Sequence, residues 1–162
     1  MTLQQFLLYC DDMIRPTEPL FRCVPADKLD WKPTEKSFTL GQQMVHIAGS
    51  LEVYGNGIAT GDWGFGSMRE RFVKNRYTPS LNVEDAVAFL NKNYQIFKSR
   101  LSSLSEEEFN SGEIDTPQFG GKAPRWRVAM LAVEHHINHK AEFFMCLKII
   151  GVDVNTGTLY RG

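Results

Sequence analysis

The chain has 162 residues, enough for one sizeable hydrophobic core and too few for two ordinary domains, so we predict a single domain over residues 1–162. Its formal net charge of −1 supplies no basic field, which argues against nucleic acid as a partner. We find no apolar run of membrane-spanning length and no signal peptide over residues 1–13, so we expect a cytoplasmic protein with no membrane partner.

Residues 2–24 carry apolar side chains at near-helical spacing. Pro16 and Pro19 interrupt this pattern, and each removes a backbone donor. We therefore predict a helix that is kinked or restarted near residue 16. Residues 25–37 are predicted to be a loop with one helical turn.

A second helix is predicted to begin at Thr39, because Thr39 and Gln42 have the spacing of a capping box ahead of an apolar-periodic segment. Its expected end is about Tyr54, because Gly55 and Gly57 follow and are interpreted as stop signals.

His46 lies near the middle of this second helix, and Gly49 shares its face. A glycine in a helix interior costs about 1 kcal/mol relative to alanine. We therefore interpret Gly49 as a residue that allows close packing or leaves space for a ligand.

Residues 55–80 are the least regular region, with glycines, aromatic residues and a short charged segment. A connection of this length is usually partly structured or functional, and this one can cover one end of the bundle. We interpret its basic residues as a solvated face rather than an anion site; they are Arg69, Arg71, Lys74 and Arg76.

A third helix is predicted to begin at Ser80 or Asn82, because an apolar stripe with spacings of four and three follows as far as Leu104. Residues 105–124 are polar and rich in glycine near their end, so we predict a loop there.

A fourth helix is predicted from about Arg125 to Ile150, with Gly151 as its stop and an irregular tail over residues 152–162. Four helical segments with little sustained period-two alternation predict an all-α fold, namely a four-helix bundle with long connecting loops.

The segment before Gly151 holds an unusual group of histidines. His135 and His139 are four residues apart, which places both imidazoles on one helix face, one turn apart. His136 points to another side of the helix. A fold that packs this helix against the second one would add His46 and complete a three-imidazole cluster.

Other interpretations of these histidines stay open. Each can be an ordinary half-buried residue of a helical core. The metalloprotease pattern H-E-x-x-H has the spacing of His135 and His139, but His136 stands where the catalytic glutamate belongs. Glu142 lies near the same face and can accept a hydrogen bond from an imidazole, ligate an ion or face solvent. Glu142 and His136 are the candidate catalytic residues.

Three passages in this order resemble the DinB/YfiT-like superfamily of metal-binding four-helix bundles. They are Lys28–Pro33 before the second helix, Ser37–Leu40 leading to His46, and the pair His135 and His139 in the last helix. The resemblance covers about residues 2–151. It implies an up-down-down-up bundle and, in many members, a homodimer.

The resemblance also implies that His46, His135 and His139 bind one divalent ion, zinc or nickel. Family members often continue their last histidine as H-R-G-Q, whereas this chain has Lys140, Ala141 and Glu142. That departure leaves the ligands intact and puts the neighbouring substrate contacts in doubt.

Characterised members of the superfamily that this chain resembles include enzymes that use a low-molecular-weight thiol as a cofactor, and many other members have no known activity. Our first hypothesis is therefore a metal-dependent thiol S-transferase that acts on a small electrophile. The second is a metal-dependent hydrolase of a small substrate, and the third is a non-catalytic metal-binding or structural dimer. Three neutral imidazoles leave a zinc-type ion an open position, which is typical of catalytic sites.

Overall fold

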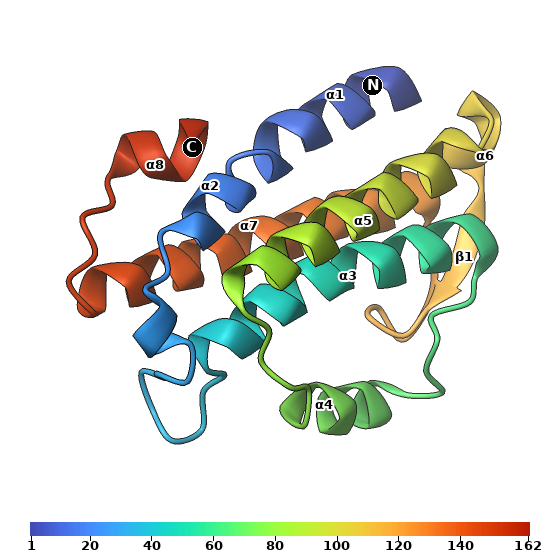
Figure 1. Ribbon diagram of the computed structural model, residues 1–162. Helices are drawn as coiled ribbons and strands as arrows, with labels where there is room; N and C mark the ends of the chain where they lie inside the picture. The colour runs from blue at the N-terminus through green and yellow to red at the C-terminus, as the bar shows by residue number, and fades with distance from the viewer.

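The computed structural model describes residues 1–162 and is mostly helical, with one small antiparallel sheet (Figure 1). Three long helices lie side by side: α3 (Leu40–Thr60), α5 (Val83–Ser102) and α7 (Arg125–Ile149). The shorter α1 (Leu3–Ile14) and α2 (Thr17–Arg22) pack across α5 and α7. Their inward faces form one continuous hydrophobic core, and none of the helices is both long and apolar enough to cross a bilayer.

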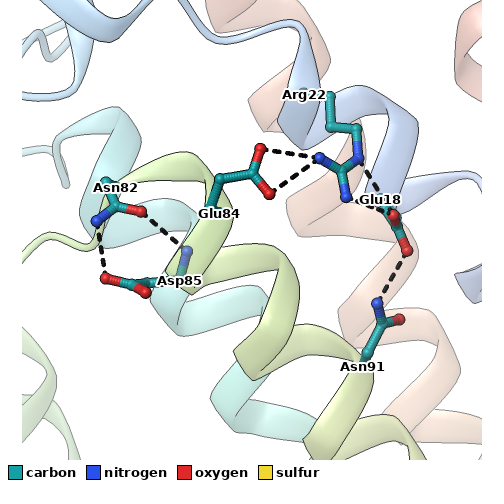
Figure 2. Close-up of polar contacts among 6 residues, drawn as sticks. All are labelled: Glu18, Arg22, Asn82, Glu84, Asp85 and Asn91. Carbon is teal, nitrogen blue, oxygen red and sulfur yellow. Dashed lines mark hydrogen bonds and ion pairs between the residues drawn. The ribbon is translucent and has the colours of Figure 1, made fainter.

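The predicted interruption of the first helix is confirmed, because α1 ends at Ile14 and α2 starts at Thr17. Polar contacts orient α2 on α5 (Figure 2). Arg22 donates to Glu84 at 3.0 Å and to Glu18 at 2.9 Å, and Asn91 donates to the second oxygen of Glu18 at 2.9 Å. These side chains are largely exposed, so the contacts add little to the free energy of unfolding and mainly fix the orientation of α2 relative to α5.

The predicted start of the second helix is confirmed. Thr39 caps α3 by accepting a hydrogen bond from the Gln42 amide at 3.2 Å, and the Gln42 side chain accepts one from the Thr39 amide at 3.1 Å. The turn predicted in the preceding loop is a short 3-10 helix, η1 (Ala26–Lys28).

The predicted end of that helix at Tyr54 is wrong, because Gly55 and Gly57 lie inside α3. Both allow close packing: a Cβ on Gly55 would lie 2.9 Å from the Cα of Phe97, and one on Gly57 would lie 2.4 Å from the ring of Trp63. The helix instead stops at Gly61, which has the left-handed φ of 79° that favours glycine.

The connector after α3 contains α4 (Met68–Arg76), so this long region is partly structured as predicted. Asn82 caps α5 by accepting from the Asp85 amide at 2.9 Å, and α7 begins at Arg125, both as expected. The capping contacts of Asn82 appear in Figure 2.

Two predictions of irregular structure are wrong. Residues 105–124 form α6 (Glu106–Ser111) and a hairpin of β1 (Glu113–Thr116) with β2 (Gly121–Pro124), paired so that Ile114 lies opposite Ala123. The tail contains α8 (Thr156–Arg161). These elements are too short to show a helical or strand period of apolar residues in the sequence. Buried apolar side chains such as Ile114 hold the hairpin against the helices.

Candidate metal centre

Two packed helices bring three histidines together. His46 comes from the middle of α3, and His135 and His139 come from successive turns of α7. One nitrogen from each ring lies within 4.8 Å of the others. The Nε2 atoms of His46 and His139 are 3.2 Å apart.

The closest pair of nitrogens has the spacing of two ligands on one small divalent ion. Two imidazole nitrogens on a tetrahedral zinc ion, each about 2.0–2.1 Å from the metal, would be about 3.3 Å apart. A single N–H to N hydrogen bond would also explain the 3.2 Å between His46 and His139. It would not explain why a third ring, His135, converges on the same point.

Burial keeps these imidazoles in the form that binds metals. It lowers the pKa of His46 to about 3 and that of His135 to about 2. Both rings are therefore neutral at pH 7. Neutral imidazole, with a free lone pair, is the ligand form of histidine.

Glu142 fixes the orientation of one ring. His139 Nδ1 donates to Glu142 Oε2 at 2.8 Å, one turn along α7. Because a carboxylate only accepts, the contact places the His139 proton on Nδ1 and leaves the lone pair of Nε2 directed at His46. Of the alternatives left open for Glu142, the structure places it as the hydrogen-bond acceptor of His139.

The structure does not bring His136 to this cluster. Its side chain is fully buried on another side of α7, with Nε2 2.7 Å from Thr17 Oγ1 on α2. One turn later Lys140 Nζ donates to the Met13 carbonyl at 2.8 Å. His136 lines neither pocket beside the cluster, so its contacts are those of a residue that joins α7 to the interruption between α1 and α2.

The three histidines form part of the wall of a cavity of about 940 Å³. The loop before α3, the helix α4 and the hairpin turn supply the remaining walls. Aromatic residues line much of it: Phe38, Tyr54, Phe65, Phe72 and Tyr77. A smaller cavity of about 440 Å³, lined in part by Glu142 and Cys146, reaches the other side of His139. Cavities of this size accept small organic molecules.

Tyr54 is a residue of this site that sequence reasoning missed. Its ring centroid lies 5.4 Å from that of His135, and burial raises the pKa of Tyr54 to about 12. The hydroxyl therefore stays protonated at neutral pH and can donate a hydrogen bond. Its position in α3, about two turns after His46, was a usable signal, but Tyr54 was interpreted as the helix end.

These features define a class of protein: a mostly helical chain in which three half-buried imidazoles form a candidate divalent-metal centre in the wall of a cavity. The sequence matches the family described as the DinB superfamily over residues 10–143. It is also 30% identical to the uncharacterized protein YjoA of Bacillus subtilis over 137 residues, covering 83% of this chain and 82% of that one. The chain therefore belongs to the DinB superfamily.

Solved structures show the same fold at low sequence identity. A DinB-like protein of Bacillus cereus superposes with a TM-score of 0.75 and 17% identity, covering 95% of this chain and 96% of that one. A putative DinB family member from Exiguobacterium sibiricum gives 0.71, with 21% identity and 96% of each chain covered. The structure of B. subtilis YjoA gives 0.69, with 22% identity over 91% of this chain and 92% of that one.

Proposed function

We propose that this protein is a metal-dependent thiol S-transferase that acts on a small electrophile. The observation that carries the proposal is the convergence of three half-buried imidazoles, two of which have a pKa lowered by burial, in the wall of a cavity large enough for two small reactants. Membership of the DinB superfamily is consistent with it.

His46, His135 and His139 would hold the ion, with zinc and nickel as the expected metals. Because all three ligands are neutral, the ion would keep its full double charge and supply a Lewis acid that activates a thiol as a nucleophile. Glu142 holds His139 in the required tautomer through the 2.8 Å contact.

The remaining walls suit an organic electrophile. Aromatic rings supply apolar surface in the cavity wall for the organic part of the electrophile. The protonated Tyr54 hydroxyl is one donor in this lining that can stabilise negative charge that develops on the electrophile or its leaving group.

An assay with monochlorobimane tests this proposal, because the reagent becomes fluorescent when a thiol replaces its chlorine. The sulfur forms the new bond to carbon, chloride leaves with the electron pair, and the thiol proton is released. Zinc-loaded or nickel-loaded protein is expected to accelerate the reaction with at least one thiol of a panel. His46→Ala and His139→Ala are expected to abolish the acceleration.

Each alternative gives a different result. Turnover of ester substrates without any added thiol would replace the proposal with a metal-dependent hydrolase. A bound ion without turnover of any of these substrates would leave a non-catalytic metal-binding protein. Activity that is unchanged in both histidine variants would contradict the proposal outright.

We also propose that α1 with α2, α3, α5 and α7 represent the four segments of an up-down-down-up bundle in a single domain. The shared core of these helices supports this arrangement. A homodimer in the cytoplasm is proposed as well. Met145 and Ile149, exposed one turn apart on α7, are consistent with a dimer, and light scattering during gel filtration tests for one.

A further inference from the structure

Arg71 carries a positive charge that has no partner in the protein. Its side chain is half-buried on α4 in the wall of the large cavity, and its guanidinium makes no side-chain hydrogen bond or ion pair. Its guanidinium carbon lies 5.7 Å from the centroid of the Phe65 ring. Burial lowers the pKa of Arg71, which reflects the cost of removing this charge from water without a compensating anion.

The position of α4 places this side chain in the same cavity as the histidines. Figure 1 shows α4 standing off from the layer of long helices, and the large cavity lies between α4 and α3. Met68, Arg71, Phe72 and Asn75 recur at the spacing of one helix face and all line the cavity. Arg71 and all three histidines line this one cavity.

The other charges of the cavity do not neutralise Arg71. Glu35 is the one acidic residue in the lining of the large cavity, and it pairs with Lys32 at 2.9 Å. Glu142, in the lining of the smaller cavity, bonds to His139. Lys36 and Arg76 add positive charge to the lining, in a chain whose net charge is −1.

We propose that Arg71 binds the carboxylate or phosphate of a small organic anion whose reacting end lies at the three histidines. The inference rests on the proposed function, and it names the substrate class of that site. A guanidinium presents two parallel N–H donors that match either oxyanion. The rings of Phe65 and Phe72 offer an apolar surface for the rest of the molecule. This proposal differs from the sequence-based interpretation of Arg71 as part of a solvated face.

Calorimetric titration with three phenyl compounds tests the assignment. Phenylacetate and phenyl phosphate carry the two oxyanions, and phenylacetamide is a neutral analogue of the first. The proteins are the wild type, Arg71→Gln and the matched control Arg69→Gln, which changes an exposed residue of the same helix outside the cavity lining. All are titrated in zinc-loaded and metal-free form, with zinc content and thermal unfolding measured alongside.

We expect at least one anion to bind the wild type and Arg69→Gln equally and more tightly than the amide. Arg71→Gln should weaken that binding about tenfold or more while zinc content and unfolding temperature stay unchanged. Arg71→Lys should restore part of it, since the charge returns without the paired donors. The preferred anion separates a carboxylate from a phosphate substrate.

Equal anion binding by Arg71→Gln and the wild type, or amide binding as tight as anion binding, would overturn the assignment. Absence of anion binding to any form of the protein would overturn it too. If no zinc binds but the anion still binds through Arg71, the anion site stands and the metal-dependent function fails. If zinc binds but anion binding does not depend on Arg71, only the proposed anion site is contradicted.

Discussion

At the scale of single residues, the hydrogen bond between His139 and Glu142 holds His139 in the tautomer that metal binding requires. Glu142→Ala removes the acceptor at 2.8 Å and frees the ring to rotate or move its proton. We expect zinc affinity to fall about 10-fold to 100-fold, measured by competition with a chelating dye. The control is Glu134→Ala, which removes a glutamate of the same helix that pairs with Arg127. Equal affinity in both variants would contradict the role of Glu142.

The neighbouring His136 has a different task, because its partner is Thr17 rather than the cavity. Thr17→Val keeps the shape of the side chain and removes the hydroxyl, which leaves a buried imidazole nitrogen unpaired. We expect the free energy of unfolding to fall by about 1–3 kcal/mol in chemical denaturation, with zinc stoichiometry unchanged. Loss of zinc from a folded Thr17→Val protein would show that His136 belongs to the metal centre.

Asp11 makes one ion pair of α1 with α5 dependent on pH. Burial tends to raise the pKa of Asp11, but hydrogen bonds from Lys98 at 2.8 Å and Tyr94 at 2.6 Å outweigh it and lower the pKa. The stabilisation is therefore present above the unfolded-state pKa of about 4 and is lost as pH falls through the folded-state value.

Asp11→Asn should accordingly destabilise the protein at pH 7 by up to about 1 kcal/mol, since the pair is partly exposed and screened by solvent. The difference from the wild type should shrink as the pH falls below about 4. Urea denaturation at pH 7 and at pH 3 measures it. A difference of the same size at both pH values would show that the charge of Asp11 is not the cause.

At the scale of elements, two glycines of α3 should respond to alanine in opposite directions. A Cβ on Gly57 would lie 2.4 Å from the ring of Trp63, whereas one on Gly49 would meet Phe89 at an ordinary 3.4 Å. Gly57→Ala should destabilise by about 1–3 kcal/mol through overpacking. Gly49→Ala should stabilise by up to about 1 kcal/mol through helix propensity. Denaturant midpoints that move in the same direction would contradict this reading of α3.

The same glycines show why helix ends were harder to predict than helices. A glycine that stops a helix and one that admits a neighbouring ring look identical in sequence, and only the position of Trp63 distinguishes Gly57 from Gly61. The beginning of α3 was predictable because the capping box of Thr39 and Gln42 is local. The box that starts α6, at Ser105 and Glu108, is equally local and was a usable signal.

At the scale of the whole molecule, predicting the candidate site required one correct inference about packing. His135 and His139 share a face by spacing alone, but His46 joins them because α3 packs against α7. The mostly helical fold followed from long apolar stripes. The approach of Arg71 could not be predicted, because α4 has no apolar stripe to specify where it packs and its position depends on the surrounding loops.

A metal ion that binds only the folded chain should also raise the free energy of unfolding of the whole molecule. An ion that binds only the folded chain, at about 100 times its Kd, adds about 2.7 kcal/mol to the free energy of unfolding. For a chain of this size that corresponds to a rise in Tm of about 5–10 °C. Differential scanning fluorimetry with and without zinc should show the rise in the wild type and in Arg69→Gln. A similar rise in His46→Ala would place the ion elsewhere.

The most direct test of the metal centre is elemental analysis of untagged protein purified without chelator, together with His46→Ala and His139→Ala. Three convergent imidazoles predict about one divalent ion per chain in the wild type and none in either variant. If the wild type holds no ion even after zinc or nickel is added, or if both variants retain the ion, the three histidines are not a metal centre.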